Sequence, residues 1–450
     1  MTADSVVSDP VGALLDPAGA LSAEGAAALA CVDSLGGYRE QDSLALAQSL
    51  RAQGFSAEVG SAALTQSRLR QRGAAKFGAA APEMLFTQAG LEQATRSPLA
   101  ALHAARFVEA GVRRVTDLGC GIGADSMAFA QAGLDVVAVE RDEVTEACVR
   151  HNLQAFPGAR TVCGEASGFL TMAGWRADRS FGGSSARAPF EGEGYWLDPA
   201  RRNTGTSGTT RIFDPEAFSP PLSFAVQLAD RGAAVGVKLG PGIPHDALPP
   251  GCEAQWTSVD GDLVEVALWY GPLAREGVRR AARVAVSSGA SLKCVEITSP
   301  VDFVASEQDA SLGPVSGYLY EPDAAVIRAG LVADLARQMG AQLMDPRIAY
   351  LRSDALLSSP FARTYRILEV LPLQVKTLRR WVREHGVSVL EIKKRGVAVT
   401  PEELRKQLLA GASRGSAGGS GGAGGGRGGK ATLVLTRIGE ERVAVVVEGA

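Results

Sequence analysis

A glycine-rich turn between a short apolar strand and a helix constrains the fold of this chain more than any other segment. Residues 112–118 (VRRVTDL) predict a buried strand, GCGIGAD forms the turn, and SMAFAQAGL predicts a helix. The glycines Gly119, Gly121 and Gly123 let the backbone turn sharply and let a ligand approach without a Cβ in the way. Such a turn lies at the crevice where open parallel sheets bind ligands.

Strands and helices continue to alternate after this turn. LDVVAVE, ARTVC, GYWLD, AAVGVKL and VEVALWYG predict strands, and VTEACVRHNLQAF and SFAVQLADRG predict helices. This alternation predicts an α/β domain over residues 96–275 with a parallel sheet covered on both faces. Before it, residues 1–95 space their apolar residues at three and four, which predicts a helical N-terminal region.

Acidic residues near the ends of the first three strands narrow the choice of ligand. A carboxylate at Asp117 suits a cationic group and would repel the pyrophosphate of a dinucleotide. Glu140 ends the second strand, where it can accept hydrogen bonds from ribose hydroxyls. Glu165 follows the third strand, where an adenine amino group could donate to it. An adenosyl ligand without phosphate fits these positions, and a dinucleotide is the alternative that the glycine spacing also satisfies.

These motifs resemble those of the class I S-adenosylmethionine-dependent methyltransferases. DLGCGIG is similar to the first motif of that family, AVERD to the second, and GEA to the usual GDA. The resemblance implies a Rossmann-like core that binds S-adenosylmethionine, with Gly123, Arg141 and Ala166 as further cofactor-binding residues. A dehydrogenase-like or catalytically silent relative is the alternative.

The segment after the fourth strand is where this fold builds the acceptor site. Nucleic-acid-directed members commonly carry Asn/Asp-Pro-Pro-aromatic there, and this chain reads Asp198-Pro199-Ala200-Arg201-Arg202. Asp198 and Pro199 fit the pattern, whereas Ala200 and Arg201 depart from it. We expect Asp198, Pro199, Arg201 and Arg202 to be catalytic, with the arginines binding phosphate, stacking on a base or pairing with acidic loops.

Two further segments adjoin the expected site. Lys238 lies on an otherwise apolar strand, where it is either a second substrate contact or a structural ion pair. No cysteine follows that strand directly, so covalent catalysis of the kind some uridine-C5 methyltransferases use is not expected. Glu92, Gln93 and Thr95 precede the core, where a segment could cover the cofactor.

A wider resemblance extends over nearly the whole chain. KF at 76–77, MLFTQAGLEQATR, LDPARR and YLYEPDAAVIRAG are similar to bacterial methyltransferases with a THUMP-like C-terminal domain. The resemblance implies a methyltransferase with an RNA substrate, and we expect methylation of tRNA or rRNA at a base nitrogen that Asp198 to Arg202 receive. The residue pattern predicts a connecting α/β region at 276–360, with strands over ARVAVSSG, YLYEPD and RIAYLRSD and one amphipathic helix over AAVIRAGLVADLARQMG. A small α/β THUMP-like domain then covers 361–450, with a flexible glycine-rich loop at 412–430.

Charge is distributed unevenly along the chain. The net charge is −3 and the pI is near 6.0, so a nucleic-acid site must be local. Residues 361–410 nevertheless hold eleven Lys and Arg against five Glu, and Lys393, Lys394 and Arg395 are the densest group. This asymmetry predicts an RNA-backbone contact, although a solvated helix face would give much of the same count. Trp381 is expected to anchor the core of this region.

Composition limits the remaining classes of function. Six cysteines without C-x-x-C and four histidines predict neither a zinc site nor a disulfide framework. No apolar run approaches the ~18 residues of a membrane span, and the first residues lack a signal-peptide pattern. We therefore expect a cytoplasmic protein that binds neither a metal ion nor a membrane. The sequence does not determine its oligomeric state. The alternatives to RNA methylation are a small-molecule or protein methyltransferase and a non-catalytic RNA-binding module.

Overall fold

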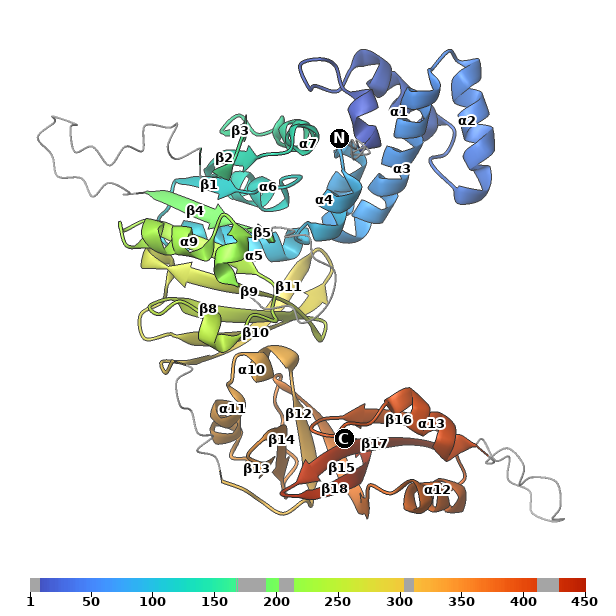
Figure 1. Ribbon diagram of the computed structural model, residues 1–450, viewed down its shortest axis with the longest axis vertical. Coiled ribbons are helices and arrows are strands. Elements are labelled where there is room, and N and C mark those ends of the chain that lie inside the picture. The colour runs from blue at the N-terminus through green and yellow to red at the C-terminus, as the bar shows by residue number, and fades with distance from the viewer. Residues whose placement is uncertain (1–8, 167, 169–191, 202–213, 303–310, 411–428) are drawn as a thin grey trace, which may run out of the picture. The chain divides into compact units, whose positions relative to one another are not determined.

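The computed structural model describes residues 9–166, 168, 192–201, 214–302, 311–410 and 429–450 (Figure 1). The chain divides into two compact units. The first holds Met1–Ala254, Glu265–Glu276 and Ser287–Lys293, and the second holds Gln255–Val264, Gly277–Val286 and Cys294–Ala450. Each unit buries a hydrophobic core of its own.

The N-terminal part of the first unit is helical, as its spacing of apolar residues predicts. Its helices are α1 (Ala23–Ser34), α2 (Ser43–Ala52), α3 (Ala57–Phe77), α4 (Gln88–Gln93) and α5 (Ser97–Glu109). Ser22 and Ser56 cap α1 and α3, because each hydroxyl accepts a hydrogen bond from a first-turn N–H, at 2.9 and 3.1 Å.

A parallel sheet forms the centre of the first unit, which confirms the predicted α/β core. Its strands are β1 (Arg114–Leu118), β2 (Asp135–Glu140), β3 (Ala159–Cys163), β4 (Glu193–Leu197) and β7 (Ala234–Leu239). They pair in the order β3-β2-β1-β4-β7, and the connecting helices are α6 (Ala124–Gln131), α7 (Glu143–Leu153) and α9 (Leu222–Ala229). The carboxyl ends of these strands therefore meet at one edge of the sheet.

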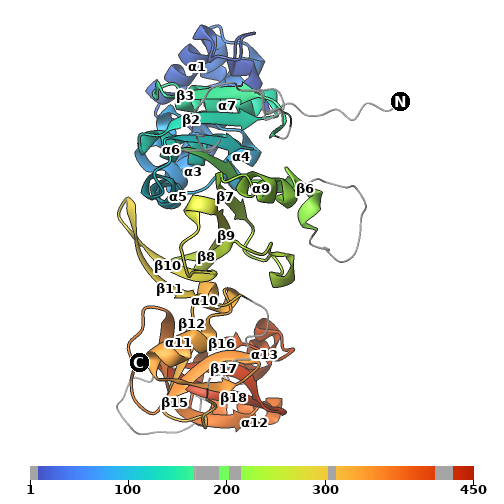
Figure 2. The same ribbon diagram turned by 90° about the vertical axis from the view of Figure 1, so that its left-hand side faces the viewer.

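A buried asparagine ties the N-terminal helices to this sheet. Figure 2 shows the helices in blue next to β2, β3 and α7. The Asn152 side chain on α7 accepts a hydrogen bond from the Leu85 N–H at 2.8 Å. Its amide donates to the carbonyls of Leu85 and Ile122 at 3.0 and 2.9 Å. Since Ile122 belongs to the glycine turn, the helical region is fastened directly to that turn.

The sheet continues past β7 through antiparallel strands. β9 (Asp262–Tyr270) pairs antiparallel with β7, and the order then runs through β8 (Glu253–Val259), β10 (Arg280–Ser288) and β11 (Ser291–Ser299). The segments VEVALWYG and ARVAVSSG predict β9 and β10, whereas β8 and β11 were not predicted from the sequence. β8 is buried throughout although it carries Glu253, Gln255 and Thr257, so its polar residues hid it. The sequence feature that could have revealed β8 is the pair Asp260-Gly261 that follows it, since Asp-Gly is typical of tight hairpin turns. These two residues adopt φ values of 54° and 90°.

One predicted helix is in fact two. The segment AAVIRAGLVADLARQMG forms α10 (Ala324–Arg328) and α11 (Val332–Met339), so the prediction of a single helix is wrong. Gly330 adopts a φ of 66°, and the next N–H, of Leu331, returns to the Val326 carbonyl at 3.0 Å. This left-handed closure ends α10, and apolar spacing alone does not reveal it.

The second unit contains a seven-stranded sheet of order β13-β14-β12-β15-β18-β17-β16. Its strands are β12 (Tyr318–Pro322), β13 (Gln342–Asp345), β14 (Ile348–Ser353), β15 (Ala362–Pro372), β16 (Val387–Lys394), β17 (Gly429–Ile438) and β18 (Glu441–Gly449). Helices α12 (Val375–Glu384) and α13 (Pro401–Leu409) pack on it. Trp381 is 9 % exposed within this core, which confirms its role as an anchor. Gly429 and Lys430 begin β17, and the rest of the predicted glycine-rich loop lies outside the described residues.

Aromatic side chains fill the centre of the first unit's sheet. Trp196 on β4 is fully buried, and its ring centroid lies 5.6 Å from that of Trp269. Phe107 and Phe129 meet Trp196 edge-on at 6.2 and 6.1 Å. Gly236 on β7 makes room for these rings, since a Cβ there would lie 2.6 Å from Trp196 Cε3. None of the described helices has the length and apolarity needed to span a membrane.

We expect Gly236→Ala to lower the free energy of unfolding by about 1–3 kcal/mol, because the added methyl group overpacks this cluster. Chemical denaturation followed by tryptophan fluorescence measures the change. Gly240→Ala is the matched control, since a Cβ at Gly240 would meet nothing within 4 Å. Equal stability of the two variants would contradict the tight packing described for Gly236.

Candidate active site

The glycine turn at the end of β1 is shaped by three left-handed glycines. Gly119, Gly121 and Gly123 have φ values of 87°, 56° and 86°, which side-chain-bearing residues rarely adopt. A Cβ on Gly123 would lie 2.4 Å from a methyl group of Val149, and one on Gly119 would lie 3.3 Å from the Asp198 carbonyl oxygen. The space beside Gly121 is open to 4 Å. The turn therefore presents bare backbone next to the segment that follows β4.

Asp117 delivers a buried carboxylate to this turn from β1. It is 1 % exposed, and its Oδ2 accepts a hydrogen bond from Ser126 Oγ at 2.6 Å. Its Oδ1 is buried and has no hydrogen-bond partner among the described residues. Burial, reinforced by Asp125, raises the Asp117 pKa well above its usual range. An orphaned acceptor of this kind fits a cationic donor such as an ammonium group.

The remaining predicted cofactor residues lie at the ends of β2 and β3. Glu140 Oε2 accepts the Gly121 N–H at 3.0 Å, and its Oε1 accepts the Arg141 N–H at 2.9 Å. The carboxylate of Glu140 thus holds the glycine turn against the end of β2. Glu165 is largely exposed and pairs with Arg141 at 3.9 Å, whereas Ala166 is buried. The structure brings all of these residues to the edge of the sheet that carries the glycine turn.

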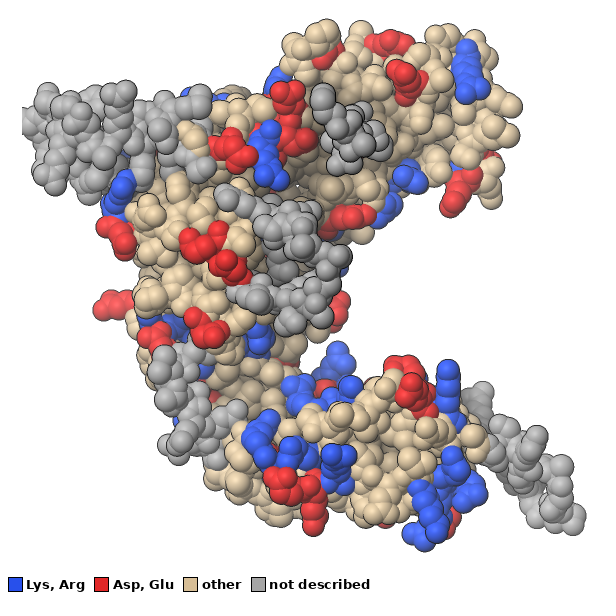
Figure 3. Space-filling model, viewed as in Figure 1, with Lys and Arg blue, Asp and Glu red and all other residues tan. Residues whose placement is uncertain are grey.

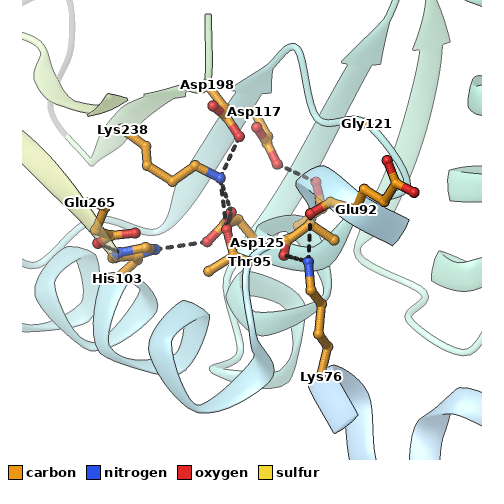
Figure 4. Close-up of polar contacts among 12 residues, drawn as sticks. Lys76, Glu92, Thr95, His103, Asp117, Gly121, Asp125, Asp198, Lys238 and Glu265 are labelled. Carbon is orange, nitrogen blue, oxygen red and sulfur yellow. Dashed lines mark hydrogen bonds and ion pairs between the residues drawn. The ribbon is translucent and has the colours of Figure 1, made fainter. Parts of the chain in front are cut away.

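Lys238 pairs with Asp198 across neighbouring strands (Figure 4). Asp198 follows β4, Lys238 lies on β7, and these strands are adjacent in the sheet. The Lys238 ammonium forms an ion pair with Asp198 Oδ2, and the Asp198 side chain is 38 % exposed. Burial raises the Asp198 pKa, and the Lys238 charge opposes that rise. Of the two interpretations that the sequence left open for Lys238, the structure shows the ion pair.

Behind Lys238 lies a buried charge array that the sequence analysis missed. His103 Nδ1 lies 2.8 Å from Asp125 Oδ1, and His103 Nε2 lies 2.7 Å from Glu265 Oε1. Burial alone would lower the His103 pKa, but Glu265 and Asp125 raise it to about 9. His103 is therefore an imidazolium at neutral pH, and both ring nitrogens donate. The available signal was a histidine on the buried face of α5, between Ala100 and Ala104.

The segment expected to cover the cofactor enters this array through Thr95. Thr95 Oγ1 accepts a hydrogen bond from Lys238 Nζ at 2.8 Å and donates one to Asp125 Oδ2 at 2.7 Å. Glu92 and Gln93 are exposed. Lys76 at the end of α3 anchors the segment, since its ammonium donates to the carbonyls of residues 91, 92 and 94 at 2.7–2.8 Å.

Other predicted catalytic residues are only partly described. Pro199 is half-buried after β4. Arg201 lies in the short strand β5 (Ala200–Arg201), whose backbone pairs with Phe218, and its side chain lies outside the described part of the structure. Arg202 also lies outside the described residues. No group of three His, Cys, Asp or Glu residues that could bind a metal ion occurs in the described ranges.

The predicted RNA-contacting residues lie at the end of β16 in the second unit. Lys393 Nζ donates to Glu321 Oε2 at 2.8 Å and lies 5.6 Å from the Tyr365 ring centroid. Arg395 stacks over the Tyr350 ring at 5.2 Å. Lys394 is exposed. The charge of Lys393 is therefore balanced inside the domain, whereas Lys394 faces solvent.

Family models match two parts of the chain. A model described as "THUMP domain-like" matches residues 362–449, which cover β15 to β18 with α12 and α13. A model of a domain of unknown function matches residues 12–73, within the N-terminal helices.

Longer similarities cover most of the chain. Proteins from two strains of Mycobacterium tuberculosis, both described as uncharacterised S-adenosylmethionine-dependent methyltransferases, are 32 % identical over 382 residues. The match covers 82 % of this chain and 91 % of each relative. A crystal structure from Porphyromonas gingivalis W83, described as a candidate methyltransferase, has a TM-score of 0.66 at 19 % identity. It covers 92 % of this chain and 99 % of that one, and it shows the same fold.

The orphaned Asp117 oxygen and the open backbone at Gly121 fit a cofactor with a cationic amino group and no phosphate. The sequence similarity to the Mycobacterium tuberculosis proteins shows the family to which the chain belongs. The chain belongs to the S-adenosylmethionine-dependent methyltransferases, it carries a THUMP-like domain at its C-terminus, and S-adenosylmethionine is its methyl donor.

Proposed function

We propose that this methyltransferase modifies a base nitrogen of RNA, in tRNA or rRNA. The observation that carries the RNA part is a cationic helix face in the THUMP-like domain. Lys376, Arg380 and Arg383 on α12 are all exposed. Their spacing of four and three residues places them on one side of the helix, away from the buried Leu378 and Val382. Figure 3 shows Lys and Arg gathered over α12.

Residues at the glycine turn would hold the cofactor. Asp117 Oδ1 would accept a hydrogen bond from the amino group, and the backbone at Gly121 would lie along the ligand. Glu140 would accept the ribose hydroxyls with its remaining lone pairs, and Glu165 would accept the adenine amino group. S-adenosylmethionine supplies an electrophilic methyl group on a sulfonium.

Asp198 is the residue that we assign to the acceptor. Its side chain is partly exposed, its backbone carbonyl lies beside Gly119 of the glycine turn, and Lys238 binds Oδ2, which leaves Oδ1 for a ligand. An ionised carboxylate accepts a hydrogen bond from an amino group and so aligns the nitrogen for in-line attack. A nitrogen that gains a methyl group must lose a proton. Asp198 is placed to take that proton and to pass it to solvent.

We expect Asp198→Ala to abolish methyl transfer while leaving cofactor affinity within a few fold, because Asp198 contacts the acceptor and not the cofactor. Purified protein would be incubated with radiolabelled S-adenosylmethionine and total RNA from a strain that lacks the gene. Asp230→Ala, at an exposed site at the end of α9, is the matched control. Label in protein or small molecules but not in RNA would contradict the RNA assignment. Equal loss of activity and cofactor binding would contradict the role of Asp198.

Cofactor affinity should rise with pH from acidic to neutral solution. Burial raises the Asp117 pKa in the free protein, and a cationic ligand that pairs with the carboxylate would lower it, so binding should favour release of a proton. Calorimetry in two buffers of different ionisation enthalpy should show proton release on binding. Asp117→Asn should bind the cofactor at least about tenfold more weakly, which equals 1.4 kcal/mol, and should lose this proton release. Proton uptake, or no pH dependence in the unmodified protein, would contradict the contact.

RNA affinity should depend on the α12 face. We expect the double variant Arg380→Glu and Arg383→Glu to bind total tRNA roughly tenfold more weakly at low salt. A plot of the logarithm of affinity against the logarithm of salt concentration should become less steep by about two, since two phosphate contacts are lost. The matched control reverses Arg51 and Arg68, which are exposed on α2 and α3. A similar loss in both variants would show non-specific attraction instead.

A further inference from the structure

Lys238 connects the acceptor side of the site to the helix that follows the glycine turn. Its ammonium binds Asp198 Oδ2, donates to Thr95 Oγ1 at 2.8 Å and lies 3.9 Å from Asp125 Oδ2 on α6. We propose that Lys238 is a positioning residue that fixes the orientation of Asp198 and keeps its carboxylate ionised. This inference rests on the proposed function, in which Asp198 receives the acceptor nitrogen.

The Lys238 ammonium is held in place by its own strand β7, by Thr95 and by Asp198. The stem of Lys238 rises from β7 between the buried Val237 and Leu239. The Thr95 hydroxyl accepts from the ammonium, and its own proton goes to Asp125, so its lone pairs face Lys238. An ammonium group has three donors, and two of them are used on Asp198 and Thr95. The carboxylate of Asp198 is therefore held at one oxygen and presents the other.

Charge around Asp198 shows why a cation is needed here. Carboxyl groups approach it from three other elements: Asp125 on α6, Glu265 on β9 and Asp117 on β1. Like charges and burial both favour the protonated form of Asp198. His103 is hydrogen-bonded to Asp125 and Glu265, so its positive charge is matched to those two groups. Among the residues that the structure describes, Lys238 is the cation in direct contact with Asp198.

Protonation of Asp198 would reverse its hydrogen-bonding role. A carboxylate accepts hydrogen bonds, whereas a carboxylic acid donates one and cannot take a further proton from the acceptor nitrogen. Loss of Lys238 should therefore lower activity most strongly at acidic pH and leave more of it at higher pH. A residue that only supported the local fold would lower activity equally at every pH.

The titration of Asp198 tests this role directly. Protein labelled with ¹³C at aspartate Cγ would be titrated by NMR, and the Asp198 signal is the one absent from Asp198→Asn. We expect Lys238→Met to raise the Asp198 midpoint by about one pH unit or more, because an opposite charge in direct contact is lost. Lys238→Arg keeps the charge and should keep the midpoint within a few tenths of a unit. An unchanged midpoint in Lys238→Met would overturn the proposal.

A second neutral variant and a pH profile of methylation complete this test. Lys238→Gln is also neutral but polar, and it should show the same upward shift if Lys238→Met does not fold. The acid limb of the methylation profile should move to higher pH in both neutral variants and return in Lys238→Arg. Because the titration needs no acceptor, it separates two failures. A lack of RNA methylation by the unmodified protein contradicts the acceptor assignment, whereas an unchanged midpoint contradicts the role of Lys238.

Discussion

The contact between the Lys238 ammonium and the Asp198 carboxylate is the interaction on which the site depends. It joins two neighbouring strands at the edge that carries the glycine turn, and it is supported by Thr95 and Asp125. Unpaired charges at this buried edge of the sheet would destabilise the folded protein, since burial removes each charged group from water. The opposite charges of His103 and Lys238 let several carboxylates crowd one end of the sheet, where we propose that the cationic cofactor binds.

The N-terminal helices take part in this arrangement. Lys76 binds the carbonyls before Thr95, and Asn152 joins the same region to Ile122 in the glycine turn. Gly90 on α4 packs so close to Ile122 that a Cβ would lie 2.4 Å from its methyl group. The helical region is therefore part of the structure that holds the candidate site, because it supplies Thr95 and supports the turn from outside.

The THUMP-like domain uses its cations in two ways. Lys393 and Arg395 are used within the fold, against Glu321 and Tyr350. Lys376, Arg380 and Arg383 on α12 are exposed, where a phosphate backbone could reach them, and Arg380 also pairs with Glu384 at 3.8 Å. A count of basic residues along the sequence does not separate these groups, since both raise the local charge equally. Burial and partners make the difference, and they are known only from the tertiary structure.

The sequence by itself determined the parallel core, the glycine turn and the C-terminal THUMP-like domain, and it favoured an adenosyl cofactor over a dinucleotide. These features are local: a strand, turn or helix leaves its pattern within a few residues, and Asp117 and Glu140 stand at fixed offsets from the glycines. Only the tertiary structure revealed the array of His103, Asp125 and Glu265 and the pairing of Lys238 with Asp198, because these partners lie far apart in the chain. It also decided the two-helix form of α10 and α11 and the buried polar strand β8. The polar residues of β8 resemble those of a loop in the sequence. In the folded chain they are buried, because buried polar groups find hydrogen-bond partners on distant segments, and composition does not show those partners.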